Sequence, residues 1–261
     1  MLSRAGILTS GYAVATAAAV GAFGFSASTL GISSAGFLAL LADGIARPGS
    51  RILYPTVTRG PRKSRRVALT FDDGPDPEVT PVVLDELARH GAHATFFSIG
   101  RSLAKHPQLA RRLVAEGHEL GNHSWRHSRW QNFFDTNEHE EEIERGERAI
   151  AAVTRRRVRP LYRPPIGLKS PQLARAASRC QLTLVAWSLH SRDTRSADPR
   201  RVAQRVLERI HPGDIVLMHD GHDRPGEHRP ACAEAVPLIL RGLGEKGLQC
   251  VTVSELLNRP R

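Results

Sequence analysis

Residues 67–75 read Val-Ala-Leu-Thr-Phe-Asp-Asp-Gly-Pro, and this stretch predicts the centre of the fold. Residues 67–70 are typical of a buried β-strand, and the chain then runs into two adjacent carboxylates, Asp72 and Asp73, followed by a Gly-Pro turn. Two acids side by side at a strand end repel each other unless a metal ion or an arginine stands beside them. Alone, Asp-Asp-Gly-Pro favours an acidic turn or a helix cap. The chemical interpretation therefore depends on the rest of the chain.

Short apolar runs alternate with helical patterns from residue 67 onward. Seven strands are expected, at residues 67–71, 94–99, 118–122, 161–163, 182–188, 215–219 and 249–253. Helices are expected between them, at residues 80–90, 102–116, 138–153, 170–179, 198–210 and 231–245. This alternation indicates βαβ units and a mainly parallel sheet, either a barrel with fewer than eight units or an open doubly wound sheet. In both forms the carboxyl ends of the strands meet on one face, where ligands bind.

Polar side chains follow the ends of several predicted strands. They are Asp72, Asp73, His123, Arg163, Asp193 and His219. Their shared placement predicts a single site. His123 and His127 are four residues apart and could clamp one ion, although such a pair is weak evidence in a chain with 12 histidines. With a carboxylate from the strand-end pair, the set has the three ligands of a hydrolytic zinc site.

Four motifs occur in one order along the chain. They are Thr-Phe-Asp-Asp-Gly-Pro at 70–75, Gly-Asn-His-Ser at 121–124 with His127, Arg-Pro-Pro-Ile-Gly at 163–167, and Val-Leu-Met-His-Asp at 216–220. Together they resemble the polysaccharide deacetylases, the NodB-homology carbohydrate esterases of family 4. The resemblance implies an α/β fold, a distorted (β/α)7 barrel, which agrees with the expected strand number. We divide the chain into a hydrophobic segment (1–46), a basic linker (47–65), a catalytic domain (66–257) and a tail (258–261).

The resemblance implies hydrolytic N-deacetylation of sugar units in a polysaccharide, a peptidoglycan fragment or a chitooligosaccharide. The water that attacks the acetamide carbonyl would be held by a divalent metal, for which we expect Zn²⁺, with Co²⁺, Ni²⁺ and Mn²⁺ as alternatives. The matching positions are Asp73, His123 and His127 for the metal ligands, Asp72 for the general base, Arg163 for the arginine that orients this base, His219 for the general acid and Asp193 for its carboxylate partner.

The expected walls of the site depart from the family pattern. The backbone N–H of Ile166 is expected to hold the oxyanion, with Pro165, Trp187 and His190 beside the substrate. The family often has Asp where His190 stands, Trp where Thr194 stands and an aromatic residue where Ile166 stands. Loss of that Trp would reshape the acetyl-side wall, and His190 is either a substrate contact or a surface residue. These departures concern the identity of the substrate and not the type of reaction.

No charged residue occurs between residues 5 and 42, a stretch long enough for one or two membrane spans. We expect residues 1–46 to form a membrane anchor, one helix or a hairpin broken near residues 21–34, at a bacterial-type inner membrane. A cleaved signal peptide with a secreted or periplasmic domain is the alternative. Seven basic residues within 47–66, among many Pro and Gly, predict a linker that contacts anionic lipid.

The net charge of +11 attracts anionic partners, yet only 5% of the residues are aromatic and none are interleaved with a basic cluster, which argues against nucleic acid. No protein partner is expected. The three cysteines lack CxxC spacing and are interpreted as buried apolar residues. Trp125 and Trp130 are either core residues or a sugar platform. Two alternative functions stay open at this point, a deacetylase or deformylase of a lipid-linked sugar and a non-catalytic glycan-binding module.

Overall fold

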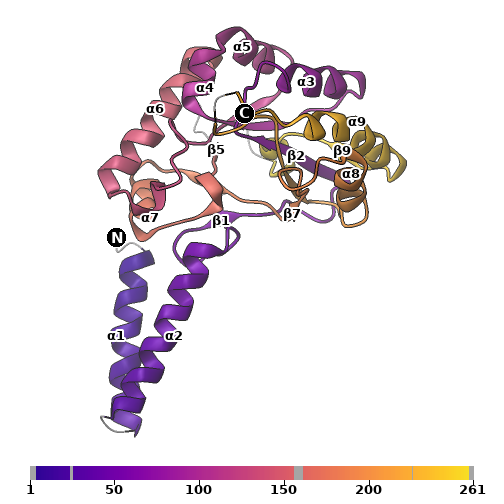
Figure 1. The fold of residues 1–261 in the computed structure, drawn as a ribbon. Helices are drawn as coiled ribbons and strands as arrows, with labels where there is room; N and C mark the ends of the chain where they lie inside the picture. Colours follow the sequence, from indigo (N-terminus) through magenta and orange to yellow (C-terminus); the bar gives the residue numbers. More distant parts are fainter. Residues whose placement is uncertain (1–3, 24–25, 156–160, 225, 259–261) are drawn as a thin grey trace.

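The protein is described by a computed structural model, which covers residues 4–23, 26–155, 161–224 and 226–258 (Figure 1). Its centre is a nine-stranded sheet in the order β1-β6-β5-β4-β3-β2-β8-β7, with β9 beside β2, and every strand pair is parallel. The strands are β1 (Thr56–Val57), β2 (Arg66–Asp72), β3 (Thr95–Ser98), β4 (Glu119–Asn122), β5 (Leu161–Tyr162), β6 (Thr183–Val185), β7 (Leu189–His190), β8 (Ile215–His219) and β9 (Gln249–Cys250). The sheet curls into a half-barrel, which confirms the predicted α/β fold of the (β/α)7 type.

Seven helices cover the outside of this sheet (Figure 1), α3 (Thr80–Arg89), α4 (Gly100–Lys105), α5 (Pro107–Ala115), α6 (Thr136–Thr154), α7 (Pro171–Arg179), α8 (Pro199–Leu207) and α9 (Pro230–Glu245). A short helix, α10 (Val253–Leu256), packs against the other face of the sheet, and two 3-10 turns are present, η1 (Gln131–Phe133) and η2 (Pro165–Gly167). The expected helix at 102–116 is in fact two helices, because the ring of Pro107 removes a backbone donor and begins a new helix. The expected last strand ends early, at Cys250, and the three cysteines are free.

Strand β2 occupies the middle of the sheet, as its apolar sequence predicted. All of its residues from Val67 to Asp72 are buried, and it pairs with β3, β8 and β9. In the register with β8, Asp72 lies opposite His219. Because parallel strands end on the same side, this register brings a carboxylate and an imidazole from distant parts of the sequence to one edge.

The N-terminal segment forms two helices, α1 (Arg4–Phe23) and α2 (Ala27–Ala46), which lie side by side and project from the domain (Figure 1). The Tyr12 hydroxyl lies 2.9 Å from the Ser34 hydroxyl, and the Tyr12 ring lies 4.7 Å from that of Phe37. Of the two predicted forms, one helix or a hairpin, the described residues show two helices, and residues 24–25 lie outside the described residues. Within the described residues, no helix is long and apolar enough to cross a membrane. The expected anchor and its lipid contacts are unsupported, and the localisation stays a prediction.

The expected linker at 47–65 belongs to the domain over part of its length. Strand β1 pairs with β6 and Leu53 is buried, so a two-residue edge strand, too short to leave a sequence pattern, extends the sheet. The buried ammonium group of Lys169 donates to the carbonyl oxygens of Pro48 (2.7 Å) and Ser50 (2.6 Å). These bonds fix the base of the hairpin to the loop after β5. The predicted tail lies outside the described residues beyond Asn258.

Candidate active site

A cavity of about 340 Å³ opens at the carboxyl ends of the strands. Its lining includes most of the residues that the sequence predicted for the site. They are Asp72, Asp73, His123, His127, Ile166, Trp187, His190 and His219. The predicted residues Arg163 and Asp193 lie behind this lining, where each contacts a residue that does face the cavity.

Asp73, His123 and His127 form the candidate metal site. Asp73 Oδ1 lies 3.6 Å from His123 Nε2 and 3.3 Å from His127 Nε2, and the three ligand atoms lie within 4.8 Å of one another. Two atoms bound about 2.1 Å from one ion at tetrahedral angles are about 3.4 Å apart. Asp73 Oδ1 is buried and has no hydrogen-bond partner among the described residues. The donor set and its spacing therefore fit a divalent metal ion.

The environment of His123 keeps its ring in the form that a metal ligand needs. Its Nδ1 lies 2.7 Å from the carbonyl oxygen of Arg163, so Nδ1–H donates there and the Nε2 lone pair faces Asp73. Burial, together with the neighbouring His127, lowers the pKa of His123 to about 3. The imidazole is therefore neutral at physiological pH and available to bind a cation.

Asp72 and Arg163 form a buried ion pair next to this cluster. Arg163 Nη1 donates to Asp72 Oδ1 at 2.6 Å, and neither residue is more than 3% exposed. Arg163 also donates to the Thr70 hydroxyl and to the carbonyl oxygens of Val185 and Ala186. Its guanidinium carbon lies over the Phe97 ring, 4.0 Å from the ring centroid. Burial raises the pKa of Asp72, although Arg163 opposes this shift. The second carboxylate oxygen of Asp72 stays 3.7 Å from His123 Nε2, close to the candidate metal site.

His219, the last residue of β8, forms a second charge pair with Asp193. His219 Nδ1 lies 3.1 Å from Asp193 Oδ1, and the His219 backbone N–H donates to Oδ2 at 2.7 Å. Burial alone would lower the pKa of His219, but the carboxylate of Asp193 outweighs it and raises this pKa to about 9. The imidazole is therefore a cation at neutral pH, with Nδ1–H held by the carboxylate.

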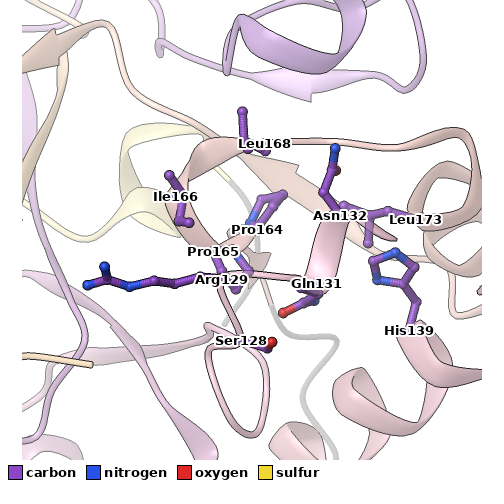
Figure 2. Close-up of a pocket in the computed structure, with 10 residues that line it drawn as sticks. All are labelled: Ser128, Arg129, Gln131, Asn132, His139, Pro164, Pro165, Ile166, Leu168 and Leu173. Carbon is purple, nitrogen blue, oxygen red and sulfur yellow. The ribbon is translucent and has the colours of Figure 1, made fainter. Parts of the chain in front are cut away.

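The remaining wall residues differ in placement. Ile166 is exposed and its φ of 59° lies in the left-handed region, which is strained for a β-branched residue. His190 faces the cavity, with its ring 6.0 Å from Trp187 and its Nδ1 accepting from the backbone of Arg192, so Nε2 carries the proton. Pro165 does not line this cavity and faces a narrower neighbouring pocket (Figure 2).

Sequence reasoning missed three charged residues of the cavity, Arg129, Asp223 and Arg229. Arg129 donates to Asp223 at 2.8 Å, and Asp223 lies 3.9 Å from His127 Nδ1. Arg229 lies 3.9 Å from Asp73. These residues stand on irregular loops, where no periodic pattern indicates the direction of a side chain. Arg129 alone carries a sequence signal, because it lies two residues after the predicted metal ligand His127.

The fold and the site together define a class, that of α/β barrels with a metal-dependent hydrolytic centre at the strand ends. A family model described as polysaccharide deacetylase matches residues 59–185. A peptidoglycan-N-acetylglucosamine deacetylase of Bacillus cereus is 37% identical over 199 residues, which cover 76% of this chain and 90% of that protein. A chitooligosaccharide deacetylase of Bradyrhizobium is 40% identical over 172 residues, or 66% of this chain and 77% of that protein.

The crystal structure of a peptidoglycan N-acetylglucosamine deacetylase in complex with an N-hydroxy-benzamide compound superposes with a TM-score of 0.72 at 30% identity. The match covers 78% of this chain and 94% of that structure. The chain belongs to the polysaccharide deacetylase family. The predicted enzyme class, a carbohydrate deacetylase that hydrolyses non-peptide carbon–nitrogen bonds, is confirmed.

Proposed function

We propose that this protein removes the acetyl group from N-acetylated sugar units of peptidoglycan or chitooligosaccharide chains, with Asp72 as general base and His219 as general acid. One observation supports this most directly. Asp72 and His219 are register partners on β2 and β8, and both line the cavity that contains the Asp-His-His cluster. Relatives at 37% and 40% identity are named for these two substrates.

The metal expected at Asp73, His123 and His127 is zinc, because two imidazoles and one carboxylate form a donor set that Zn²⁺ prefers. When bound, such an ion would polarise the acetamide carbonyl and lower the pKa of a water molecule.

Asp72 accepts the proton of the attacking water in this proposal. Arg163 holds one carboxylate oxygen, so only the other oxygen is directed at the cavity, which fixes where the proton goes. The exposed loop at Ile166 would present its backbone N–H to the oxyanion of the tetrahedral intermediate. His219 then donates its Nε2 proton to the amine nitrogen as the carbon–nitrogen bond breaks, releasing acetate and a free amino sugar.

Acetate release from N-acetylglucosamine oligomers and peptidoglycan fragments tests this proposal. Asp72→Asn and His219→Ala should each abolish release while leaving the circular dichroism spectrum unchanged. Matched controls are Asp85→Asn and His211→Ala, because both residues are exposed and distant from the cavity. Full activity in Asp72→Asn would contradict the assigned base.

Removal of the metal separates catalysis from simple glycan binding. A chelator should stop acetate release by the unmodified enzyme, and stoichiometric Zn²⁺ should restore it. The alternative, a non-catalytic glycan-binding module, predicts oligomer binding without acetate release under any metal condition.

A further inference from the structure

The loop that carries the proposed oxyanion donor is held by little packing of its own. Residues 163–170 connect β5 to α7, and the side chain of Ile166 in their middle is 53% exposed. The φ of Ile166 is 59°, which is strained for a β-branched residue. A strained backbone persists only where its surroundings hold it in place. The loop therefore needs a restraint from another part of the chain.

The turn that follows α2, at residues 47–50, contacts this loop directly. A Cβ added at Gly167, the residue after Ile166, would lie only 2.9 Å from Cγ of Pro48 and 2.6 Å from Cη2 of Trp187. Gly167 therefore contacts both the Pro48 ring and the indole of Trp187, and this indole lines the catalytic cavity. A shift of Pro48 would act on the backbone one residue from Ile166.

Lys169 fastens the end of the loop to the same turn. Its ammonium group donates to the carbonyl oxygens of Pro48 (2.7 Å) and Ser50 (2.6 Å), and its backbone N–H donates to that of Ile45 (3.2 Å). The residue is 2% exposed and forms no ion pair with a described carboxylate. A buried ammonium group is costly unless it is hydrogen-bonded, so both carbonyl oxygens are needed. We call these three bonds the Lys169 clamp.

The turn is itself ordered by α2. The Ser50 hydroxyl donates to Asp43 Oδ2 at 2.7 Å, and the Ser50 backbone N–H donates to the carbonyl oxygen of Arg47 at 2.9 Å. Helix α1 contacts α7, which begins two residues after Lys169 (Figure 1). The loop after β5 is therefore attached to the two N-terminal helices as well as to the barrel.

We propose that Lys169 is a positioning residue, which fixes the backbone of Ile166 for catalysis by holding the loop after β5 against the turn after α2. Lys169 does not line the cavity, so it acts through Ile166. The inference rests on the proposed function, in which the Ile166 N–H binds the oxyanion, and it gives the N-terminal segment a part in the reaction. Because the oxyanion forms only during the reaction, a displaced N–H should lower kcat and leave substrate binding unchanged.

Lys169→Met tests this role, because it keeps most of the side-chain length and removes the ammonium group. At pH 7, kcat for acetate release from an N-acetylglucosamine oligomer should fall about tenfold to hundredfold, with KM changed less than about twofold. Lys246→Met, at the exposed lysine that follows α9, is the matched control and should behave as the unmodified enzyme. An unchanged kcat, or a higher KM with kcat retained, would overturn the positioning role.

Pro48→Ala tests the same contact without leaving a buried polar group unpaired, so it decides the matter if Lys169→Met lowers the melting temperature into the range of the assay. It should lower kcat about threefold with KM unchanged, because the loop loses its contact at Gly167. With the fold retained, the double variant should lose less than the product of the two single losses, because both changes release one loop. An unchanged kcat in Pro48→Ala, or losses that multiply, would contradict the shared restraint.

Amide hydrogen exchange separates this inference from the proposed reaction. In Lys169→Met, peptides that contain residues 166–169 and 45–50 should exchange faster than in the unmodified enzyme, and peptides from β2 and β8 should exchange as before. Unchanged exchange at residues 166–169 would contradict the Lys169 clamp, even if acetate release is confirmed. Faster exchange there, in a protein that never releases acetate, would support the clamp and refute the proposed reaction.

Discussion

Asp193→Asn tests whether His219 is the proton donor, because it removes one charge and keeps the side-chain size. The carboxylate of Asp193 is buried 3.1 Å from His219 Nδ1, and it raises the imidazole pKa from 6.5 to about 9 against the effect of burial. The difference between these pKa values corresponds to about 3 kcal/mol in favour of the imidazolium. Without the charge of Asp193, burial still lowers the pKa of His219 while Asp73 and Asp72 still raise it, so this pKa should fall from about 9 toward its ordinary value of 6.5.

The expected loss of activity follows from the population of the imidazolium. At pH 8 about nine-tenths of the rings are protonated with a pKa of about 9, and about one in thirty with a pKa of 6.5. Asp193→Asn should thus lower kcat/KM about 30-fold at pH 8 and recover most of it as the pH falls toward 6.

The assay is acetate release by the unmodified enzyme and by Asp193→Asn, measured across the pH range. In the unmodified enzyme kcat/KM should fall on the alkaline side near pH 9, and in Asp193→Asn this fall should move to below pH 7. Asp85→Asn, an exposed acid on α3, serves as the control and should leave the fall near pH 9 in place. A variant that loses the same factor at every pH would refute the reasoning, since Asp193 would then act on structure and not on the charge of His219.

Three further predictions concern the metal ligand Asp73, the buried arginine and the packing of α6. Asp73→Asn should weaken zinc binding more than about tenfold in competition with a chromophoric chelator, and unchanged affinity would place the metal elsewhere. Arg163→Met breaks a buried ion pair and should lower the free energy of unfolding in urea by about 3–5 kcal/mol, so a loss below 1 kcal/mol would show that water enters the pair. Gly146→Ala would place Cβ 2.3 Å from Asn122 Oδ1 and should cost about 1–3 kcal/mol, whereas Gly244→Ala, a helix position with open space, should be neutral or stabilising.

The motif-bearing strands could be predicted from the sequence because parallel strands impose a rule. Buried apolar runs of four or more residues indicate strands, and their carboxyl ends must meet on one face. Asp72, His123 and His219 follow such runs, and the structure brings all three to one cavity. The same rule and the four-residue spacing of His123 and His127 predicted a site with two histidines and one carboxylate, and the resemblance to the family then assigned that carboxylate to Asp73.

The parts that sequence reasoning missed depend on contacts between distant irregular segments. Strand β1 has two residues, too few for an alternating pattern, and it exists because β6 offers an open edge. Asp223 meets Arg129 only through the course of the loop after β8. Gln131 belongs to no motif or periodic pattern, and the burial of its side chain appears only in the structure.

The backbone at Asp72 and Asp73 explains how two adjacent carboxylates avoid repelling each other. Successive side chains of a strand point to opposite faces, so Asp72 and Asp73 could not share one cavity if β2 continued. Strand β2 ends at Asp72, and Asp73 has a φ of 74°, which turns the chain so that both carboxylates line the same cavity. Arg163 neutralises the first and two imidazoles face the second. The left-handed residue therefore gives two neighbours in sequence separate partners, as their proposed roles of base and metal ligand require.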